Sequence, residues 1–240
     1  MLTENLVSIQ TTMAAAALRS GRNPSEVELV AVSKTHPPEA VQEALDAGQL
    51  IFGESRVQEA RAKILQLPGR IRWHFIGHLQ KNKVRHALSL FELFHGIDSL
   101  ELAGDVNRIA DEMGAFPRVL LEVNVAGEST KFGFTPERVR AQLEPLLALR
   151  RLQIEGLMTI APYAEEGESS RRYFAALREL RDGLQTEFRV PLPRLSMGMS
   201  GDFEVAIEEG ATLVRVGTAI FGKRSGKGWR PAAGSATNDD

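Results

Sequence analysis

Short apolar runs alternate with longer amphipathic stretches along almost the whole of this 240-residue chain. The apolar runs have the length of strands and lie at residues 28–34, 50–55, 71–77, 93–98, 118–125, 152–161, 194–200 and 212–222. Runs this continuous are typical of strands that are covered on both faces. Strands that alternate with helices in this way predict a parallel sheet.

The stretches between the runs have ends that are typical of helices. Residues 37–48 begin with two prolines and end in glycine, and residues 99–114 begin with a serine that can cap the helix. Residues 135–150 begin with Thr-Pro. The first twenty residues predict an amphipathic helix rather than a signal peptide, because they lack an apolar core followed by a cleavage site.

About eight strand–helix units predict a single α/β domain, a (β/α)8 TIM-type barrel, a fold that runs to roughly 250 residues. An open doubly wound sheet fits the same alternation, but no G-x-G-x-x-G motif follows the first run. The expected barrel covers residues 1–222. Residues 223–240 are polar and rich in Gly, Ser and Ala, which predicts a disordered tail.

Composition narrows the classes of partner and of site. The chain has no cysteine, which excludes disulfides and thiolate metal sites, and its net charge of −2 argues against nucleic acid as the main partner. No apolar run approaches the roughly 20 residues of a membrane span. The histidines lack metal-like spacing with carboxylates, so we predict no metal site. We expect a cytoplasmic protein that binds neither nucleic acid nor membranes.

Polar side chains concentrate where the predicted strands end, whereas the residues that begin the strands are plain by comparison. The polar residues at the strand ends are Ser33, Lys34, His36, Glu54, Ser55, His78, Asp98, Glu122, Asn124, Thr159, Ser200, Asp202 and Arg215. In a barrel of this kind the chemistry gathers at the carboxyl ends of the strands. We therefore expect a functional site at that end.

Lys34 is the last residue of the first run, 28–34. A lysine in a barrel mouth is partly desolvated, which favours its neutral and nucleophilic form. A neutral amine can form an imine with an aldehyde. The alternative is a structural lysine that caps a loop or pairs with Glu54 or Asp98.

Two glycine turns after the last two strands favour an anion site. Ser200 and Gly201 lead into a helix, and Gly217 is followed by Thr218. Backbone N–H groups at such positions bind phosphate, and each turn taken singly is also compatible with an ordinary helix cap. An aldehyde-reactive lysine facing a phosphate site indicates pyridoxal 5′-phosphate, with Arg215 within reach of the pyridine nitrogen.

The chain resembles the pyridoxal phosphate homeostasis proteins in six motifs: AVSKTHPPEAVQEALDAG, FGESRVQEA, WHFIGHLQKNKVRHAL, VNVAGESTKFGF, GLMTIAPYAEE and LSMGMSGDFEVAIEEGATLVRVGTAIFG. They occur in order over residues 5–222. The resemblance implies the barrel that this family shares with the N-terminal domain of alanine racemase.

The resemblance also implies a set of cofactor-binding residues. Lys34 would carry the cofactor as an internal aldimine, a Schiff base, and Arg215 would contact the ring nitrogen. His78 and Met199 would lie near the plane of the cofactor. The implied phosphate contacts are Ser200, Gly201, Gly217 and Thr218.

One position departs from the family pattern. The family usually has Gly-Glu-Asn after the second strand, whereas this chain has Gly53-Glu54-Ser55. Serine offers one short hydroxyl in place of a two-ended amide. A contact near the cofactor is then lost or bridged by water, and Ser55 is the weakest of the predicted site residues.

The function that the resemblance implies is intracellular vitamin B6 homeostasis, by a monomer that supplies or buffers the cofactor for apoenzymes. A cation at the pyridine nitrogen disfavours ring protonation and weakens the cofactor as an electron sink, so no catalytic residue is assigned. One alternative is a small amino-acid racemase, which needs a second base beside Lys34. The chain has two tyrosines for that role, Tyr163 and Tyr173. Another alternative is a barrel aldolase that acts on a sugar phosphate.

Overall fold

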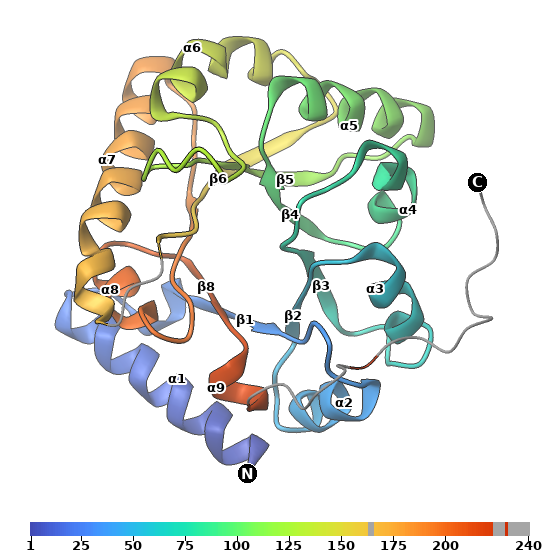
Figure 1. Cartoon of the computed structure of the whole chain (residues 1–240), viewed down its shortest axis with the longest axis vertical. Coiled ribbons are helices and arrows are strands. Elements are labelled where there is room, and N and C mark those ends of the chain that lie inside the picture. Colours follow the sequence, from blue (N-terminus) through green and yellow to red (C-terminus); the bar gives the residue numbers. More distant parts are fainter. Residues whose placement is uncertain (163–165, 223–228, 230–240) are drawn as a thin grey trace.

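Eight parallel strands close into one barrel in the computed structural model, which describes residues 1–162, 166–222 and 229. The strands follow one another in chain order, and β8 pairs with β1 to close the ring. Helices form the outer layer (Figure 1). The predicted (β/α)8 barrel is therefore confirmed.

The barrel strands are short. They are β1 (Glu28–Val32), β2 (Ile51–Glu54), β3 (Arg72–Phe75), β4 (Leu93–Ile97), β5 (Arg118–Glu122), β6 (Gln153–Met158), β7 (Arg194–Ser196) and β8 (Leu213–Val216). The helices around them are α1 (Leu2–Arg19), α2 (Pro38–Asp46), α3 (Val57–Ile64), α4 (Val84–Leu88), α5 (Leu100–Met113), α6 (Pro136–Leu147), α7 (Arg171–Phe188), α8 (Phe203–Glu208) and α9 (Thr218–Phe221). Three single 3₁₀ turns are η1 (Pro24–Glu26), η2 (Lys81–Lys83) and η3 (Gly167–Ser170). None of the helices in these described parts is long and apolar enough to cross a membrane.

The helix ends form where the sequence predicts them. The Ser99 hydroxyl accepts the N–H of Leu102 at the start of α5, and Gly114 ends that helix with φ 65°. A left-handed residue at this position favours glycine because it has no Cβ to clash. Thr135 caps α6 in the same way as Ser99 caps α5.

All eight strands are shorter than their apolar runs, and the last two fall furthest short in proportion to their length. The run 194–200 is extended only as far as Ser196, because Gly198 adopts φ +90° and turns the chain toward α8. A Cβ at Gly198 would lie 2.5 Å from the Cβ of Ala206, so only glycine allows this approach. The run 212–222 is extended only over β8, and its second half is α9 rather than strand.

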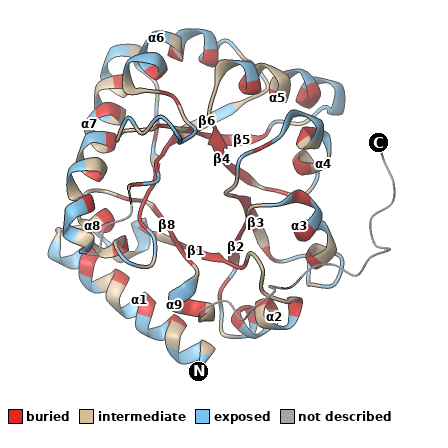
Figure 2. Cartoon of the chain, in the orientation of Figure 1, coloured by how far each residue is buried: buried red, intermediate tan, exposed pale blue. Residues whose placement is uncertain are grey.

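Buried residues lie along the strands and on parts of the surrounding helices (Figure 2). The buried apolar residues form two clusters, one between the strands and the helices and one inside the barrel. The residues of the inner cluster, which we call the apolar layer, are Val30, Ile51, Leu93, Leu120, Met158 and Leu213. Gly156 lets β6 approach β7, since a Cβ there would lie 1.8 Å from the carbonyl oxygen of Arg194. The apolar layer separates the mouth of the barrel from its N-terminal end.

The prediction that the strand beginnings are plain was wrong. Three glutamates and three arginines alternate there in a closed ring, which we call the ion-pair ring: Glu28, Arg72, Glu92, Arg118, Glu155 and Arg194. Each side chain pairs with both neighbours at N–O distances of 2.5–3.0 Å, and each is 20–35% exposed. Single charges scattered along the sequence thus close the N-terminal end of the barrel.

Candidate functional site

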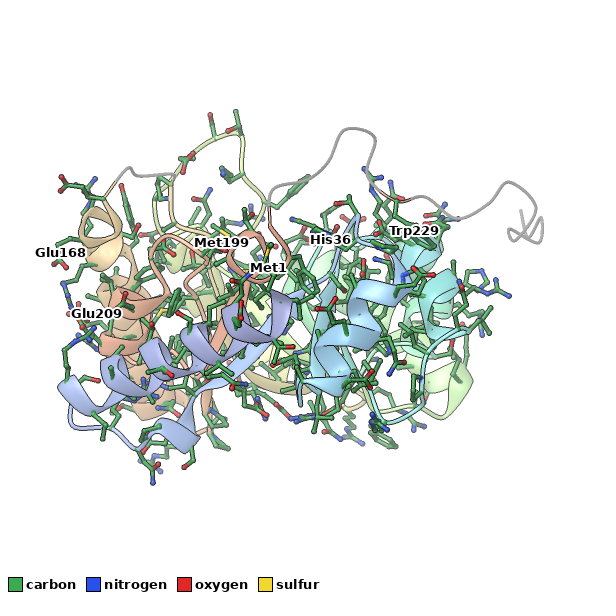
Figure 3. All side chains as sticks on the ribbon, turned by 90° about the horizontal axis from the view of Figure 1, so that it is seen from below. Met1, His36, Glu168, Met199, Glu209 and Trp229 are labelled. Atoms are coloured by element: carbon green, nitrogen blue, oxygen red, sulfur yellow. The ribbon has the colours of Figure 1, made fainter. Side chains whose placement is uncertain are left out.

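The candidate site lies at the carboxyl ends of the strands, the mouth of the barrel. Figure 3 shows Met199 and His36, which follow β7 and β1, on the same side of the molecule as Trp229. Lys34 stands two residues beyond β1 and is half-buried. Val30 of the apolar layer and Val32 precede it on the inner face of β1, and Lys34 lies in the turn that follows at the mouth of the barrel.

A buried cluster outside the barrel wall fixes the backbone next to Lys34. The hydroxyl of Ser33 donates to Glu54 Oε1 at 2.7 Å, and Lys63 Nζ donates to the Ser33 carbonyl oxygen at 2.8 Å. Lys63, which is fully buried in α3, also lies 2.7 Å from both Glu54 Oε1 and Glu59 Oε1. Buried charges of this kind are tolerated when they are paired and hydrogen-bonded.

The position of Glu54 in this cluster shifts the pKa of its carboxyl. Its carboxyl is buried, which raises its pKa to about 7 even though Lys63 lies beside it. Its second oxygen, Oε2, has no hydrogen-bond partner among the described residues. Glu54 pairs with Lys63, and Asp98 pairs with His78.

The residue on the other side of Lys34 is held from two directions. Thr35 has φ 67°, an unusual left-handed conformation for a β-branched residue, and its N–H donates to Glu59 Oε1 at 2.5 Å. Its carbonyl oxygen accepts the N–H of Trp229 at 2.8 Å. The indole of Trp229 lies 5.3 Å from Lys63 Nζ, within cation–π range.

This contact bears on the predicted tail. The sequence predicts a disordered tail over residues 223–240. Of these, residues 223–228 and 230–240 lie outside the described residues. Trp229 itself is half-buried against the loop that carries Lys34. No periodic pattern in the sequence indicates this contact.

The loops after β7 and β8 come together as an anion cradle. The N–H of Gly217 points to Ser200 Oγ at 3.4 Å, so the two predicted glycine turns are neighbours. Within the described chain, the N–H groups of Ser200, Gly201 and Thr218 donate to no other group. A Cβ on Gly217 would lie 3.2 Å from the carbonyl oxygen of Val32, so a side chain there would crowd β1. Unused N–H groups in two neighbouring glycine turns fit the oxygens of a phosphate.

Arg215 lies inside the barrel between the apolar layer and this cradle. It shares the inner face of β8 with Leu213 and Gly217, and it is 5% exposed. Its Nη1 donates to Ser196 Oγ at 2.5 Å, and its Nη2 donates to the Thr159 carbonyl oxygen at 2.9 Å. Burial lowers the pKa of Arg215 to about 10, so the guanidinium stays charged at neutral pH.

His78 lies on the opposite rim. Its Nδ1 is 2.9 Å from Asp98 Oδ2, and its ring stacks on Phe132 with centroids 4.0 Å apart. Glu122 lies near this pair. Burial of its carboxyl, and to a smaller extent the negative charge of Asp98, raise the pKa of Glu122 to about 7. The rim at β4 and β5 therefore carries acidic groups across from the cradle.

Met199 and Ser55 complete the predicted residues. Met199 is 39% exposed in the loop after β7, where its N–H donates to Asp202 Oδ1. Ser55 is half-buried after β2, and a Cβ on Gly77 would lie 2.5 Å from its carbonyl oxygen. Its hydroxyl makes no hydrogen bond with the described residues.

Two further polar residues, which sequence reasoning missed, stand behind Arg215. His95 Nδ1 lies 2.8 Å from Ser196 Oγ, and His95 Nε2 lies 3.1 Å from His74 Nδ1. Both histidines are fully buried. The available signal was that both histidines interrupt apolar runs at positions that face inward.

Residues 7–225 match the family described as alanine racemase, N-terminal domain. A pyridoxal phosphate homeostasis protein of Aquifex aeolicus is 46% identical over 222 residues, covering 92% of this chain and 97% of that protein. PipY of Synechococcus elongatus, solved with PLP bound, is 42% identical with a TM-score of 0.80, covering 92% of this chain and 100% of PipY. An alanine racemase of Clostridium difficile shares the fold at 17% identity and a TM-score of 0.73, covering 95% of this chain and 58% of the racemase.

Proposed function

Because this chain belongs to the pyridoxal phosphate homeostasis protein family, we propose that it binds pyridoxal 5′-phosphate as a Schiff base on Lys34 and takes part in the intracellular balance of that cofactor. The resemblance noted from the six motifs is confirmed by these relatives. The observation that carries the proposal is the placement of Lys34 at the same barrel mouth as an unpaired N–H cradle, with a buried cation beneath the cradle.

Each predicted residue has a role in this proposal. The cofactor supplies an aldehyde that reacts with primary amines, and Lys34 supplies the amine. Arg215 would face the pyridine nitrogen of the bound cofactor, and His78 and Met199 would lie near its ring. The phosphate contacts are Ser200, Gly201, Gly217 and Thr218. Ser55, with one hydroxyl in place of an amide, is at most a water-bridged contact.

We further propose that binding proceeds without amino-acid turnover. The relatives are named as homeostasis proteins rather than as racemases. Tyr173 cannot provide a second base, because it lies in α7 with its hydroxyl accepting from Arg172 on the exposed outer surface. Tyr163, the other tyrosine, lies outside the described residues. Arg215 stays cationic at neutral pH and disfavours protonation of the ring nitrogen.

The binding test uses absorption spectra of the full chain with added pyridoxal 5′-phosphate, followed by borohydride trapping and mass spectrometry. We expect a yellow imine band that traps on Lys34 and disappears in Lys34→Ala. Lys81→Ala is the matched control, because Lys81 lies in η2 and pairs with Glu101. A band that survives in Lys34→Ala, or that traps on another lysine, contradicts the proposal.

The turnover test separates the carrier from the racemase. The loaded protein is incubated with L-alanine and with D-alanine in deuterium oxide, and the α-proton is followed by NMR. We expect no interconversion and no exchange above the rate with free cofactor. Sustained racemisation would restore the racemase alternative. The monomeric state, the cytoplasmic location and apoenzymes as recipients belong to the same proposal, and ultracentrifugation checks the first of these.

A further inference from the structure

A hydrogen-bonded chain crosses the barrel interior behind Arg215. It runs from Arg215 Nη1 to Ser196 Oγ at 2.5 Å, on to His95 Nδ1 at 2.8 Å, and from His95 Nε2 to His74 Nδ1 at 3.1 Å. The four residues come from β8, β7, β4 and β3, and each is at least 95% buried. His74 Nε2, at the far end, has no partner among the described residues.

The donors and acceptors assign one direction to this chain. A guanidinium only donates, so Ser196 Oγ accepts from Arg215. The one acceptor left within reach of the serine proton is His95 Nδ1, so the hydroxyl donates to it. Burial lowers the pKa of both histidines, that of His74 to about 3, so both rings are neutral. Each neutral ring then carries its proton on Nε2, and His95 donates to His74 Nδ1.

This direction has a consequence for Arg215. Because His95 holds the serine proton, the hydroxyl cannot rotate to present that proton to the guanidinium. Ser196 therefore offers Arg215 a fixed acceptor, and the Thr159 carbonyl oxygen fixes the second nitrogen at 2.9 Å. Two of the five N–H groups are held in this way, and the remaining ones are left for a ligand in the mouth.

We propose that His95 is a positioning residue that acts through Ser196 to aim the Arg215 guanidinium at the pyridine nitrogen of bound cofactor. The inference rests on the proposed function, because it takes pyridoxal 5′-phosphate as the ligand. His95 touches neither the cofactor nor Lys34 in this scheme. Its effect reaches the ring nitrogen only through Ser196 and Arg215.

The experiment uses pyridoxal 5′-phosphate labelled with ¹⁵N in the ring, bound to the full-length protein. The readouts are the ring ¹⁵N chemical shift and the apparent Kd from absorbance titration. We expect Ser196→Ala and His95→Leu to displace the ¹⁵N resonance and raise Kd by about tenfold, the range of one hydrogen bond to a charged group. Both variants should still trap the cofactor on Lys34.

Conservative variants and a packing control separate position from stability. Ser196→Thr keeps the hydroxyl and should restore the wild-type resonance. Leu120→Val opens space in the apolar layer without changing any of the four hydrogen-bonded residues, and it should leave the ¹⁵N resonance unchanged. If His95→Leu does not fold, His95→Asn and His95→Gln replace it. Asparagine keeps an acceptor at the level of Nδ1 and should match wild type, whereas glutamine should not.

The outcomes distinguish this inference from the function beneath it. Absence of a trapped adduct on Lys34 in the wild type would overturn the proposed function and the inference together. A wild type that binds the cofactor on Lys34, but whose ¹⁵N shift and Kd are unchanged in Ser196→Ala and in His95→Leu or His95→Gln, would overturn the inference alone. A shift in Leu120→Val as large as that in Ser196→Ala would also overturn it, because the effect would then come from packing.

Discussion

Removing one arginine from the ion-pair ring should measurably destabilise the barrel. Arg118 pairs with Glu92 at 2.6 Å and with Glu155 at 2.5 Å, and its side chain is 25% exposed. Partly exposed pairs contribute roughly 0.5–1 kcal/mol each, so the Arg118→Met variant should lose about 1–2 kcal/mol of unfolding free energy. For a chain of this size that corresponds to a fall in Tm of about 2–8 °C.

The pH dependence of this loss follows from Glu92. Its hydrogen bond from Arg72 comes first among the causes that hold its pKa below the usual 4.5, and the charge of Arg118 adds to it. A carboxyl whose pKa is lowered by folding stabilises the fold above its unfolded pKa, and the stabilisation is lost as pH falls through the lowered value. The difference between wild type and Arg118→Met should therefore be complete at pH 7 and shrink below about pH 4.5.

The assay is urea unfolding followed by circular dichroism at pH 7 and at pH 4. Arg138→Met is the matched control, because Arg138 is an exposed arginine of α6 with no ion pair among the described residues. It removes the same charge and should change stability by less than about 0.5 kcal/mol. Equal losses in the two variants, or a loss in Arg118→Met that grows toward low pH, would refute the assignment to the ring.

Four further predictions concern other parts of the molecule. Lys63→Met should cost about 3–5 kcal/mol in urea unfolding, because it leaves two buried carboxylates without their cation, and a loss below 1 kcal/mol would contradict this. Folding raises the pKa of Glu54 to about 7, so the protonated carboxyl stabilises the fold, and this stabilisation is lost as pH rises from 4.5 through 7. Glu54→Gln should flatten the fall in unfolding free energy over this pH range. An unchanged slope would show that other groups cause the fall. Gly156→Ala should cost more than about 3 kcal/mol or prevent folding, because its Cβ would lie 1.8 Å from the carbonyl oxygen of Arg194, and a wild-type Tm would contradict this. Trp229→Ala should lose about 0.5–1 kcal/mol and speed amide hydrogen exchange in the loop at 33–36, whereas unchanged exchange would show that the indole does not hold that loop.

The alternation of strands and helices was readable because it depends on local periodicity. The eight units follow from periods of two and 3.6 residues, and the helix ends follow from their capping residues. The apolar run 212–222 predicts strand throughout, but its second half is helix α9. The sequence TAIF (218–221) is equally compatible with an apolar strand and an apolar helix. Gly217 marks the change from strand to helix there, but a glycine does not by itself indicate which element follows.

The rest of the site depends on closure of the barrel and is invisible to local patterns. His95 and Ser196 are 101 residues apart, and they meet only because β4 and β7 face each other across the interior. The same holds for the ion-pair ring, whose charges lie singly at the beginnings of strands. Lys63 reads as one more polar residue on a helix, yet it is fully buried against the backbone of Ser33.

Closure of β8 onto β1 also has a consequence for synthesis on the ribosome. The first strand emerges early, but its last partner is complete only roughly 180 residues later. At a translation rate of about 5–20 residues per second, the edge of β1 that pairs with β8 stays unpaired for about 10–40 s. An unpaired edge is a template for wrong pairing, so the nascent chain is most exposed to misassembly at its oldest strand. The carbonyl of Thr35 waits longer still, because its partner, Trp229, is made after β8.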